Sequence, residues 1–315
     1  MAMPPSSQTP PAGLIMELVT PLTPQGRLDA AGLERLVQRV RPGADGLLAG
    51  SPLAGEGLDL PAALRMDLLG HLLDLIDDCP LFFTITGDSE AETRELAAAA
   101  GAEHRRRQGA GPLWLADLPL WYHSNRGLPR YYQGLLEETG VPLVLFNLPE
   151  AVQRRAALFK HRNLRTQVFK KLAALPGVVG LIYQGDMRRF LNYHLAAVNR
   201  PALPFYEADE ERFLTRPGAW GVVSAGAQLL PEAWQRVTRA CLHPEEAVDD
   251  YEYRRVLWED SQRLLALTAL YRSAPAPLLK AALNARGVLA SESTAPGTPL
   301  PPAPQKQKLL EFQVH

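Results

Sequence analysis

Few side chains in this chain could form an imine with a carbonyl compound. Six residues are lysines, and they stand at positions 160, 170, 171, 280, 306 and 308. A lysine amine can lose its proton and attack a carbonyl carbon, whereas an arginine guanidinium stays protonated in proteins. All other cationic side chains apart from histidine are arginines, so the six lysines can be inspected one by one as candidates for covalent catalysis.

Carboxylates are the second group that could do chemistry. Glu207 and Asp209 stand two residues apart at the end of an apolar segment, where they could act as general acid and base or hold a divalent cation. The alternative is that they cap a loop, because hard cations usually take more oxygen ligands than two residues supply. Glu56 lies between glycines, and we favour a structural role in which it accepts backbone N–H groups, as buried carboxylates normally do.

Aromatic and imidazole side chains offer a third possibility. Tyr122, His123 and Tyr183 could form a proton relay, because histidine changes its charge near neutral pH. The alternative is that Trp121 and Tyr122 pack at a subunit contact, where aromatic residues are enriched. We favour packing, because no nucleophile is evident beside these residues.

Composition narrows the class of protein. The 315 residues carry a formal net charge of −1, and 46% of them are hydrophobic, which gives no reason to expect nucleic acid or an anionic membrane as partner. The arginines at 105–107 and at 154–155 could contact anions, but neighbouring acids favour solvated helix surfaces. No apolar run is long enough to span a membrane, and residues 1–12 lack the features of a signal peptide. We therefore expect a cytoplasmic protein.

Apolar segments recur at regular intervals and predict eight strands. They span residues 14–20, 46–50, 81–86, 113–118, 142–148, 178–184, 203–208 and 221–226. Most are continuous rather than alternating, which is typical of strands buried on both faces of a parallel sheet. Helical patterns lie between them, such as the stretch after Ser89, whose Ser-x-x-Glu spacing matches a capping box. Alternation on this scale predicts an α/β fold of the (β/α)₈ TIM-barrel class.

The remainder of the chain predicts a helical appendage. Helices are expected over residues 231–242, 244–271 and 275–287, followed by a proline-rich extended end. We expect a disordered lead at 1–12, a barrel at 13–228, and helices with a tail at 229–315. In such barrels the chemistry sits at the carboxyl ends of the strands, which is where the candidate residues above fall.

Seven segments, taken in order, resemble the pyruvate-dependent class I aldolases typified by dihydrodipicolinate synthase and N-acetylneuraminate lyase. GSPLAGEG resembles the family's GTTGES loop, LVLFNLP its YNVP strand end, and GVVGLI its VGIK strand. The others are VTPLTPQGRLDAAGLERLV, LPLWYHSNRGLPRYY, GAWGVVSAGAQLLP and APAPLLKAALNARG. The resemblance runs from Gly13 to about Leu310. It implies a TIM barrel, lyase chemistry on a keto acid, no cofactor, and a homodimer or homotetramer.

The resemblance also implies a set of catalytic groups. A lysine on the sixth strand attacks the keto carbon of pyruvate and forms an imine that serves as an electron sink. A tyrosine at the end of the fifth strand relays protons, with a second tyrosine and a threonine, and an arginine after YNVP holds the carboxylate. In this chain Gly180-Leu181 is followed by Ile182 where the family has lysine, and a shift of one residue gives Tyr183.

The other roles are vacant as well. The family tyrosine falls on Phe146 and the arginine on Ala151, while the tyrosines of PYYN fall on Leu120 and Trp121. The GTTGE loop has become GSPLAGE, with apolar residues in place of hydroxyls. None of the six lysines stands at a strand end, so we expect no catalytic residue of the family type. The predicted pocket consists of Ser51, Leu53, Ala54, Glu56, Trp121, Tyr122, Phe146, Ala151, Ile182, Tyr183, Glu207, Asp209 and Ser224.

Two hypotheses stay open on the sequence alone. In the first, the chain is a ligand-binding or regulatory homologue that is not a functional synthase and binds a keto acid or another carboxylate. In the second, it is an active lyase, aldolase or hydratase with a non-lysine or metal-assisted mechanism that uses Tyr183, His123, Glu207 and Asp209. The fold alone cannot choose between them, because barrels of this class host many functions. Loss of the nucleophile at Ile182 favours the first hypothesis.

Overall fold

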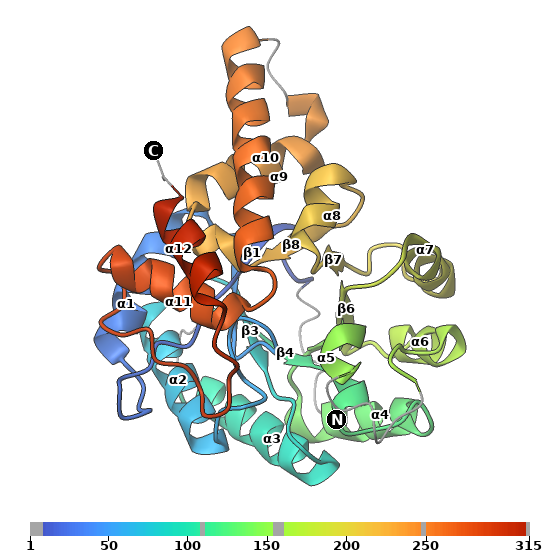
Figure 1. Cartoon of the computed structure of the whole chain (residues 1–315). Helices are drawn as coiled ribbons and strands as arrows, with labels where there is room; N and C mark the ends of the chain where they lie inside the picture. Colours follow the sequence, from blue (N-terminus) through green and yellow to red (C-terminus); the bar gives the residue numbers. More distant parts are fainter. Residues whose placement is uncertain (1–8, 108–110, 154–160, 247–249, 313–315) are drawn as a thin grey trace.

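A closed barrel of eight parallel strands forms the body of the computed structural model, which describes residues 9–107, 111–153, 161–246 and 250–312 (Figure 1). The strands pair in sequence order, and β8 returns to β1. They are β1 (Gly13–Glu17), β2 (Gly46–Ala49), β3 (Leu81–Thr84), β4 (Leu113–Asp117), β5 (Leu143–Asn147), β6 (Val178–Tyr183), β7 (Phe205–Glu207) and β8 (Gly221–Ser224). The TIM-barrel prediction is confirmed.

The strands are buried along their whole length, which explains why the apolar segments are continuous. Closure depends on a close approach of β1 and β8, since a Cβ atom on Gly221 would lie 2.2 Å from the carbonyl oxygen of Gly13. The first predicted strand, 14–20, is longer than β1. Beyond Glu17, side chains replace part of the strand pairing: Gln228 accepts from the Val19 N–H at 2.9 Å.

Helices connect the strands on the outside of the barrel. They are α1 (Ala30–Val40), α2 (Ala62–Leu75), α3 (Glu90–Arg106), α4 (Leu128–Thr139), α5 (Pro149–Gln153), α6 (Thr166–Ala173), α7 (Met187–Ala196) and α8 (Glu210–Thr215). Single 3₁₀ turns occur at Arg41–Gly43, Pro119–Trp121, Gly226–Gln228 and Pro244–Glu246. As the sequence predicts, Ser89 caps α3 by accepting from the Glu92 N–H at 3.2 Å. The Glu92 carboxylate accepts from Asp88 N–H, so the second half of the capping box is displaced by one residue.

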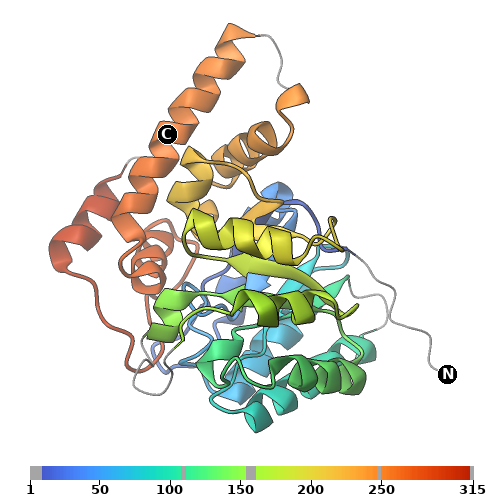
Figure 2. The same ribbon diagram turned by 90° about the vertical axis from the view of Figure 1, so that its right-hand side faces the viewer.

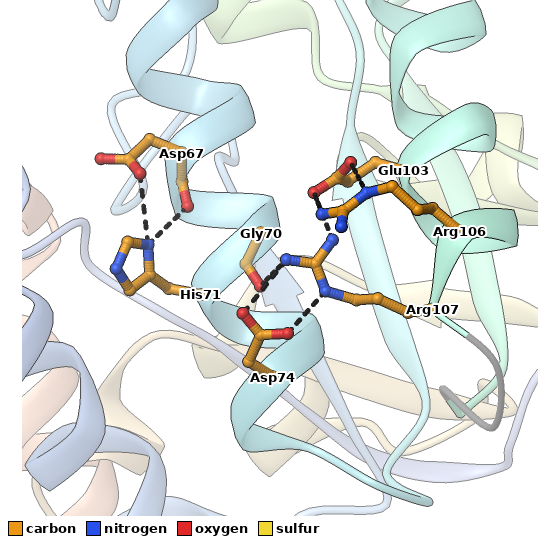
Figure 3. A network of polar contacts seen from close by, with 7 residues as sticks. All are labelled: Asp67, Gly70, His71, Asp74, Glu103, Arg106 and Arg107. Carbon is orange, nitrogen blue, oxygen red and sulfur yellow. Dashed lines mark hydrogen bonds and ion pairs between the residues drawn. The ribbon is translucent and has the colours of Figure 1, made fainter.

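Ion pairs join α2 to α3 on the outer surface (Figure 3). Arg107, just beyond the end of α3, donates to Asp74 of α2 at 2.6 Å and also to Glu103. Arg106 donates to Glu103 as well. Arg106 therefore lies on a solvated helix surface, as the neighbouring acids predict, whereas the side chain of Arg107 is largely buried between α2 and α3. Arg154 and Arg155 lie outside the described residues.

The C-terminal appendage consists of α9 (Pro231–Leu242), α10 (Tyr251–Tyr271), α11 (Pro275–Ala285) and α12 (Ala303–Glu311). The views agree that α10 projects away from the barrel, and that α11 and α12 lie close together beside its base (Figures 1 and 2). The expected extended end is wrong from Ala303 onward, because α12 follows Pro302 and buries Leu309. Within the described residues, no helix is long and apolar enough to cross a membrane.

Candidate functional site

Ile182, which the resemblance aligns with the family's imine-forming lysine, lies on β6. Ile182 is 0% exposed, and its strand neighbours in register are Phe146 of β5 and Tyr206 of β7. The next residue, Tyr183, is also fully buried and donates its hydroxyl to the Asp186 carbonyl at 2.7 Å. The sixth strand therefore offers no nucleophile at its carboxyl end.

One lysine among the described residues is buried, and it is already engaged. Lys280 of α11 is 0% exposed and forms an ion pair with Glu56, while its Nζ also donates to the Ser293 carbonyl at 2.8 Å. Glu56 accepts in addition from Ala295 N–H at 2.8 Å and from Thr298 Oγ1 at 3.0 Å. This set of contacts fastens the loop after β2 to the C-terminal segment, in agreement with the structural role favoured for Glu56. Lys160 lies outside the described residues.

A carboxylate that the sequence patterns did not indicate stands at the end of β1. Glu17 is 4% exposed, and its Oε1 accepts from Ser51 Oγ and, at 2.8 Å, from the Ala54 N–H. Burial raises the pKa of Glu17 from 4.5 to about 7, and the nearby Glu210 acts in the same direction while the two hydrogen bonds oppose it. Glu17 can therefore change its charge near neutral pH. One signal was available: an acid within the apolar segment LIMELVT.

A second unforeseen carboxylate, Glu210, begins α8 after β7. It accepts from Ser224 Oγ of β8, from the Gly226 N–H at 2.9 Å, and from the hydroxyl of Tyr271. Burial raises the pKa of Glu210, and these hydrogen bonds counteract the shift. Because Tyr271 lies at the end of α10, the appendage contributes directly to this end of the barrel.

Together these groups border a pocket of about 340 Å³ at the carboxyl ends of the strands, which we term the mouth pocket. Its lining comes from the ends of β1 and β8, the segments after β2, β5, β6 and β7, and the turn between α10 and α11. The lining residues are Glu17, Pro52, Leu53, Glu150, Ala151, Gln184, Ala208, Asp209, Glu210, Glu211, Val223, Ala225, Thr268, Tyr271, Arg272, Ser273 and Pro275. This is the end of the barrel where enzymes of this fold carry their active sites.

Comparison with known proteins identifies the family. The model of the dihydrodipicolinate synthetase family matches residues 10–312. The chain belongs to this family. It is 27% identical over 254 residues to a 4-hydroxy-tetrahydrodipicolinate synthase of Stenotrophomonas maltophilia, covering 77% of this chain and 78% of that one. It is also 27% identical to 4-hydroxy-tetrahydrodipicolinate synthase 2 of Streptomyces coelicolor, over 99% of this chain and 98% of that one.

Solved structures of the family share the fold. Dihydrodipicolinate synthase from Bacteroides thetaiotaomicron superposes with a TM-score of 0.79 at 24% identity, covering 97% of this chain and 98% of that one. A monomeric dihydrodipicolinate synthase variant superposes with a TM-score of 0.77 at 19% identity, covering 98% and 97%. The family assignment expected from the seven segments is confirmed. The match over residues 10–312 includes the C-terminal appendage as well as the barrel.

The predicted pocket residues of this family member separate into groups. Leu53, Ala151 and Asp209 line the mouth pocket. Ser51 and Ala54 donate hydrogen bonds to the lining residue Glu17. Ser224 donates one to the lining residue Glu210. The remaining predicted residues lie elsewhere: Glu56 with Lys280, Phe146 and Ile182 in the buried barrel wall, and Trp121, Tyr122, Tyr183 and Glu207 in contacts of their own.

The three residues considered for a relay are not joined by hydrogen bonds among the described residues, although the rings of Tyr122 and His123 lie edge to face at 6.4 Å between their centroids. Tyr122 donates to Asp117 at the end of β4 at 2.6 Å, whereas His123 pairs with Glu90 at 3.1 Å. Tyr183 donates to a backbone carbonyl near α7. Within the described part of the chain no hydrogen bond links the three, so each has a local role.

Asp117 organises a polar cluster at the carboxyl end of β4. Its carboxylate accepts from Thr86 Oγ1, Tyr122 OH and Tyr132 OH, each at 2.6 Å. Burial raises the pKa of Asp117, and the three hydroxyls oppose the shift. All of its donors come from β3 and β4 loops or α4, so the cluster positions backbone segments and offers no free base.

Glu207 and Asp209 form the loop contact that was the alternative to a metal site. Asp209 N–H donates to Glu207 at 3.0 Å, and Arg212 lies 3.7 Å from Glu207. Burial raises the pKa of Glu207 to about 7. Among the described residues, the one group of three metal-type ligands that converge is the exposed set His243, Glu245 and Glu246, far along the chain from both.

Proposed function

We propose that this member of the dihydrodipicolinate synthetase family does not form an imine with pyruvate and is a ligand-binding or regulatory homologue. The observation that carries the proposal is the wholly buried Ile182 on β6. In addition, no lysine stands among the described lining residues of the mouth pocket. Without an amine at that place, a keto acid has no electron sink. The relatives are named as synthases, but fold and family do not transfer an activity whose chemical group is missing.

The charge of the mouth pocket supports the same conclusion. The lining residues that the structure describes include five acids and one arginine, Arg272, which pairs with Glu211. The acids are Glu17, Glu150, Asp209, Glu210 and Glu211. A keto acid bears a carboxylate, which would be repelled here. Ala151, where the resemblance implies a carboxylate-binding arginine, provides no compensating cation.

The decisive experiment is intact-mass analysis after incubation with pyruvate and sodium borohydride. We expect no mass increase, beside a lysine-bearing family member that labels fully. An adduct of the mass of reduced pyruvate would overturn the proposal. Lys280→Met is the matched control in that case, because it would show whether the buried Lys280 had been the site of labelling.

A single restoring change tests the account of the pocket further. Ile182→Lys returns an amine to β6, but the carboxylate clamp and the tyrosine relay would still be absent. We expect the variant to show no synthase turnover in a coupled assay. Robust turnover would mean that the remaining pocket is competent and that the proposal is wrong.

The second candidate is an active lyase or hydratase with a non-lysine mechanism. One observation favours it: Glu17 borders the mouth pocket with a pKa of about 7, as suits a general acid or base. Of Tyr183, His123, Glu207 and Asp209, only Asp209 lines that pocket. The test is turnover of a hydroxy keto acid. This candidate would be established if turnover were lost in Glu17→Gln, kept in Glu207→Gln and unaffected by chelation.

We also propose that the chain self-associates as a homodimer or homotetramer. Met187, Leu191, Leu195 and Val198 are 41–71% exposed, and their spacing places them along one face of α7 and just beyond its end. A contiguous apolar face of this kind marks an interaction surface. Light scattering should show a lower mass for Leu195→Glu than for Leu300→Glu, a control leucine that is 82% exposed in the tail. Equal masses would remove α7 from the interface.

A further inference from the structure

The lining of the mouth pocket is strongly unbalanced in charge. Five carboxylates face it, from Glu17, Glu150, Asp209, Glu210 and Glu211, while one guanidinium, that of Arg272, lies among the described lining residues. Arg272 and Glu211 neutralise one another at 2.5 Å. Four carboxyl groups therefore border the cavity without a cationic partner in its lining, and like charges held together raise the free energy of the empty site.

Hydrogen bonding gives a second observation, independent of the charges. One oxygen of Glu17 and one of Gln184 have no hydrogen-bond partner among the described residues. Glu17 is more than nine-tenths buried, and both of its hydrogen bonds end on Oε1, so Oε2 receives none from the described part of the chain. Gln184 Oε1 is buried with no partner, while its Nε2 donates to Glu150 at 3.4 Å. Buried polar atoms normally have partners. Gln184 Oε1 is an acceptor, and Glu17 Oε2 becomes one when the carboxyl group loses its proton, so a ligand that carries hydrogen-bond donors fits both atoms.

The spacing of the acids distinguishes an organic cation from a metal ion. A divalent cation needs several oxygen ligands around one point, at distances of about 2.0–2.6 Å. No three carboxylates of the mouth pocket bring oxygens within 4.8 Å of one another, as far as the described residues show. Charges spread around a cavity fit a ligand that carries its donors at separate positions.

Apolar groups form the rest of the wall. Leu53, Ala151, Val223, Ala225 and Pro275 contribute to the lining, so a short alkyl segment can pack between the polar contacts. A volume of about 340 Å³ lies at the small end of the range for ligand pockets, which is roughly 300–1,000 Å³. The site accommodates one small molecule.

We infer that the mouth pocket binds a small organic cation, an alkylammonium or alkylguanidinium, whose N–H donors meet Glu17 Oε2 and Gln184 Oε1. This inference rests on the proposed function, because an imine-forming pocket for a keto acid would require the opposite charge. The ligand supplies the cation that the family's lysine and arginine positions, Ile182 and Ala151, no longer provide.

Binding should depend on pH in a direction set by Glu17. The groups that face it are Ser51 and Ala54 N–H from the segment after β2, Glu210 of α8, and Tyr271 of α10. Since the pKa of Glu17 is about 7 in the empty site, a cation binds best to the deprotonated form and displaces its proton. Affinity should rise from pH 6 to pH 8, and protons should be released near pH 6.5.

Isothermal titration calorimetry on the full chain tests the inference with 1,4-diaminobutane and agmatine as probes. The neutral 1,4-butanediol and the anionic succinate are controls of matched length. We expect binding of at least one cation at pH 8 that weakens at pH 6 and at high salt, and no heat from the two controls. No binding of either cation between pH 6 and pH 8, or equal binding of butanediol, would overturn the inference.

Variants locate the binding. Glu17→Gln should weaken cation binding about tenfold or more, as loss of a charged hydrogen bond does, whereas Glu207→Gln removes an equally buried acid outside the pocket and should leave it unchanged. Glu150→Gln, at an exposed residue of the lining, serves if Glu17→Gln does not fold, and should weaken binding severalfold. Wild-type affinity in both lining variants would contradict the site.

The borohydride experiment on the same preparation separates the two proposals. A pyruvate adduct would overturn the proposed function whether or not a cation binds. Absence of both an adduct and cation binding would leave the proposed function standing and remove the inference alone.

Discussion

Two buried glutamates near the carboxyl ends of the strands meet opposite electrostatic surroundings. Glu56, after β2, pairs with Lys280 and accepts two further hydrogen bonds from the C-terminal segment. Glu17, at the end of β1, has two hydrogen bonds on one oxygen, and no ion pair joins it to any residue that the structure describes. The first carboxylate is neutralised within the protein, whereas the second retains its proton up to about pH 7. At Glu56 the chain itself supplies the partners of a buried carboxylate, whereas at Glu17 one carboxylate oxygen is left for a ligand.

The largest expected effect comes from breaking the completed site. Lys280→Met leaves the buried Glu56 carboxylate without its cation, and breaking a buried ion pair in this way typically destabilises a protein by about 3–5 kcal/mol. Urea unfolding should show this loss. In the double variant Lys280→Met/Glu56→Gln much of the stability should return, because the isolated charge is gone. A single variant within about 1 kcal/mol of wild type would mean that the ion pair and the tail do not fasten this end of the barrel.

An intermediate effect is expected at the incomplete site, and it should depend on pH. The pKa of Glu17 is raised in the folded state, so the folded protein keeps a proton that the unfolded chain loses above pH 4.5. Stability therefore falls as pH rises from about 4.5 to 7. Glu17→Gln removes this contribution, and relative to wild type it should gain stability by up to about 3 kcal/mol between pH 5 and pH 8.

The measurement is urea unfolding of wild type and variant across that pH range. Glu207→Gln is a useful companion, because the pKa of Glu207 is also raised to about 7 and should give a change of the same sign. A Glu17→Gln curve parallel to that of wild type would show that Glu17 is ionised in the folded protein, and the contrast with Glu56 would disappear.

The smallest effect is expected at the exposed ion pairs between α2 and α3 (Figure 3). Arg107 lowers the pKa of Asp74 by hydrogen bonding, but the Asp74 side chain is 65% exposed. Water screens such a pair, so Asp74→Asn should cost less than about 1 kcal/mol at pH 7, and nothing at a pH below the depressed pKa. A loss of stability in Asp74→Asn as large as that in Lys280→Met would mean that burial does not determine how much these ion pairs stabilise the protein.

Much of the fold could be predicted from residue patterns. The continuous apolar segments gave eight strands, and Ser89 marked the start of α3. Errors concentrated where tertiary contacts decide: β1 ends at Glu17 because side chains such as Gln228 take over the pairing, and α12 forms after a proline-rich stretch because Leu309 packs against the body. Periodicity does not register either effect.

The candidate site was predicted less completely. The sequence pointed to Leu53, Ala151 and Asp209, which line the mouth pocket, and to the hydrocarbon at Ile182. It missed Glu17 and Glu210, since attention went to the positions that the resemblance aligns with the family's catalytic groups, and neither glutamate is among them. A search for acids within apolar strand segments would have found Glu17.

The sequence by itself determined the barrel, the family resemblance and the residue types at the family's catalytic positions, because these depend on local pattern and on order along the chain. The tertiary structure decided which acids meet. Lys280 and Glu56 are 224 residues apart, and Tyr271 reaches Glu210 from 61 residues away. Whether a buried carboxylate has a cation beside it depends on such distant partners. Glu56 has one in Lys280, whereas the oxygen of Glu17 that receives no hydrogen bond is left for a ligand.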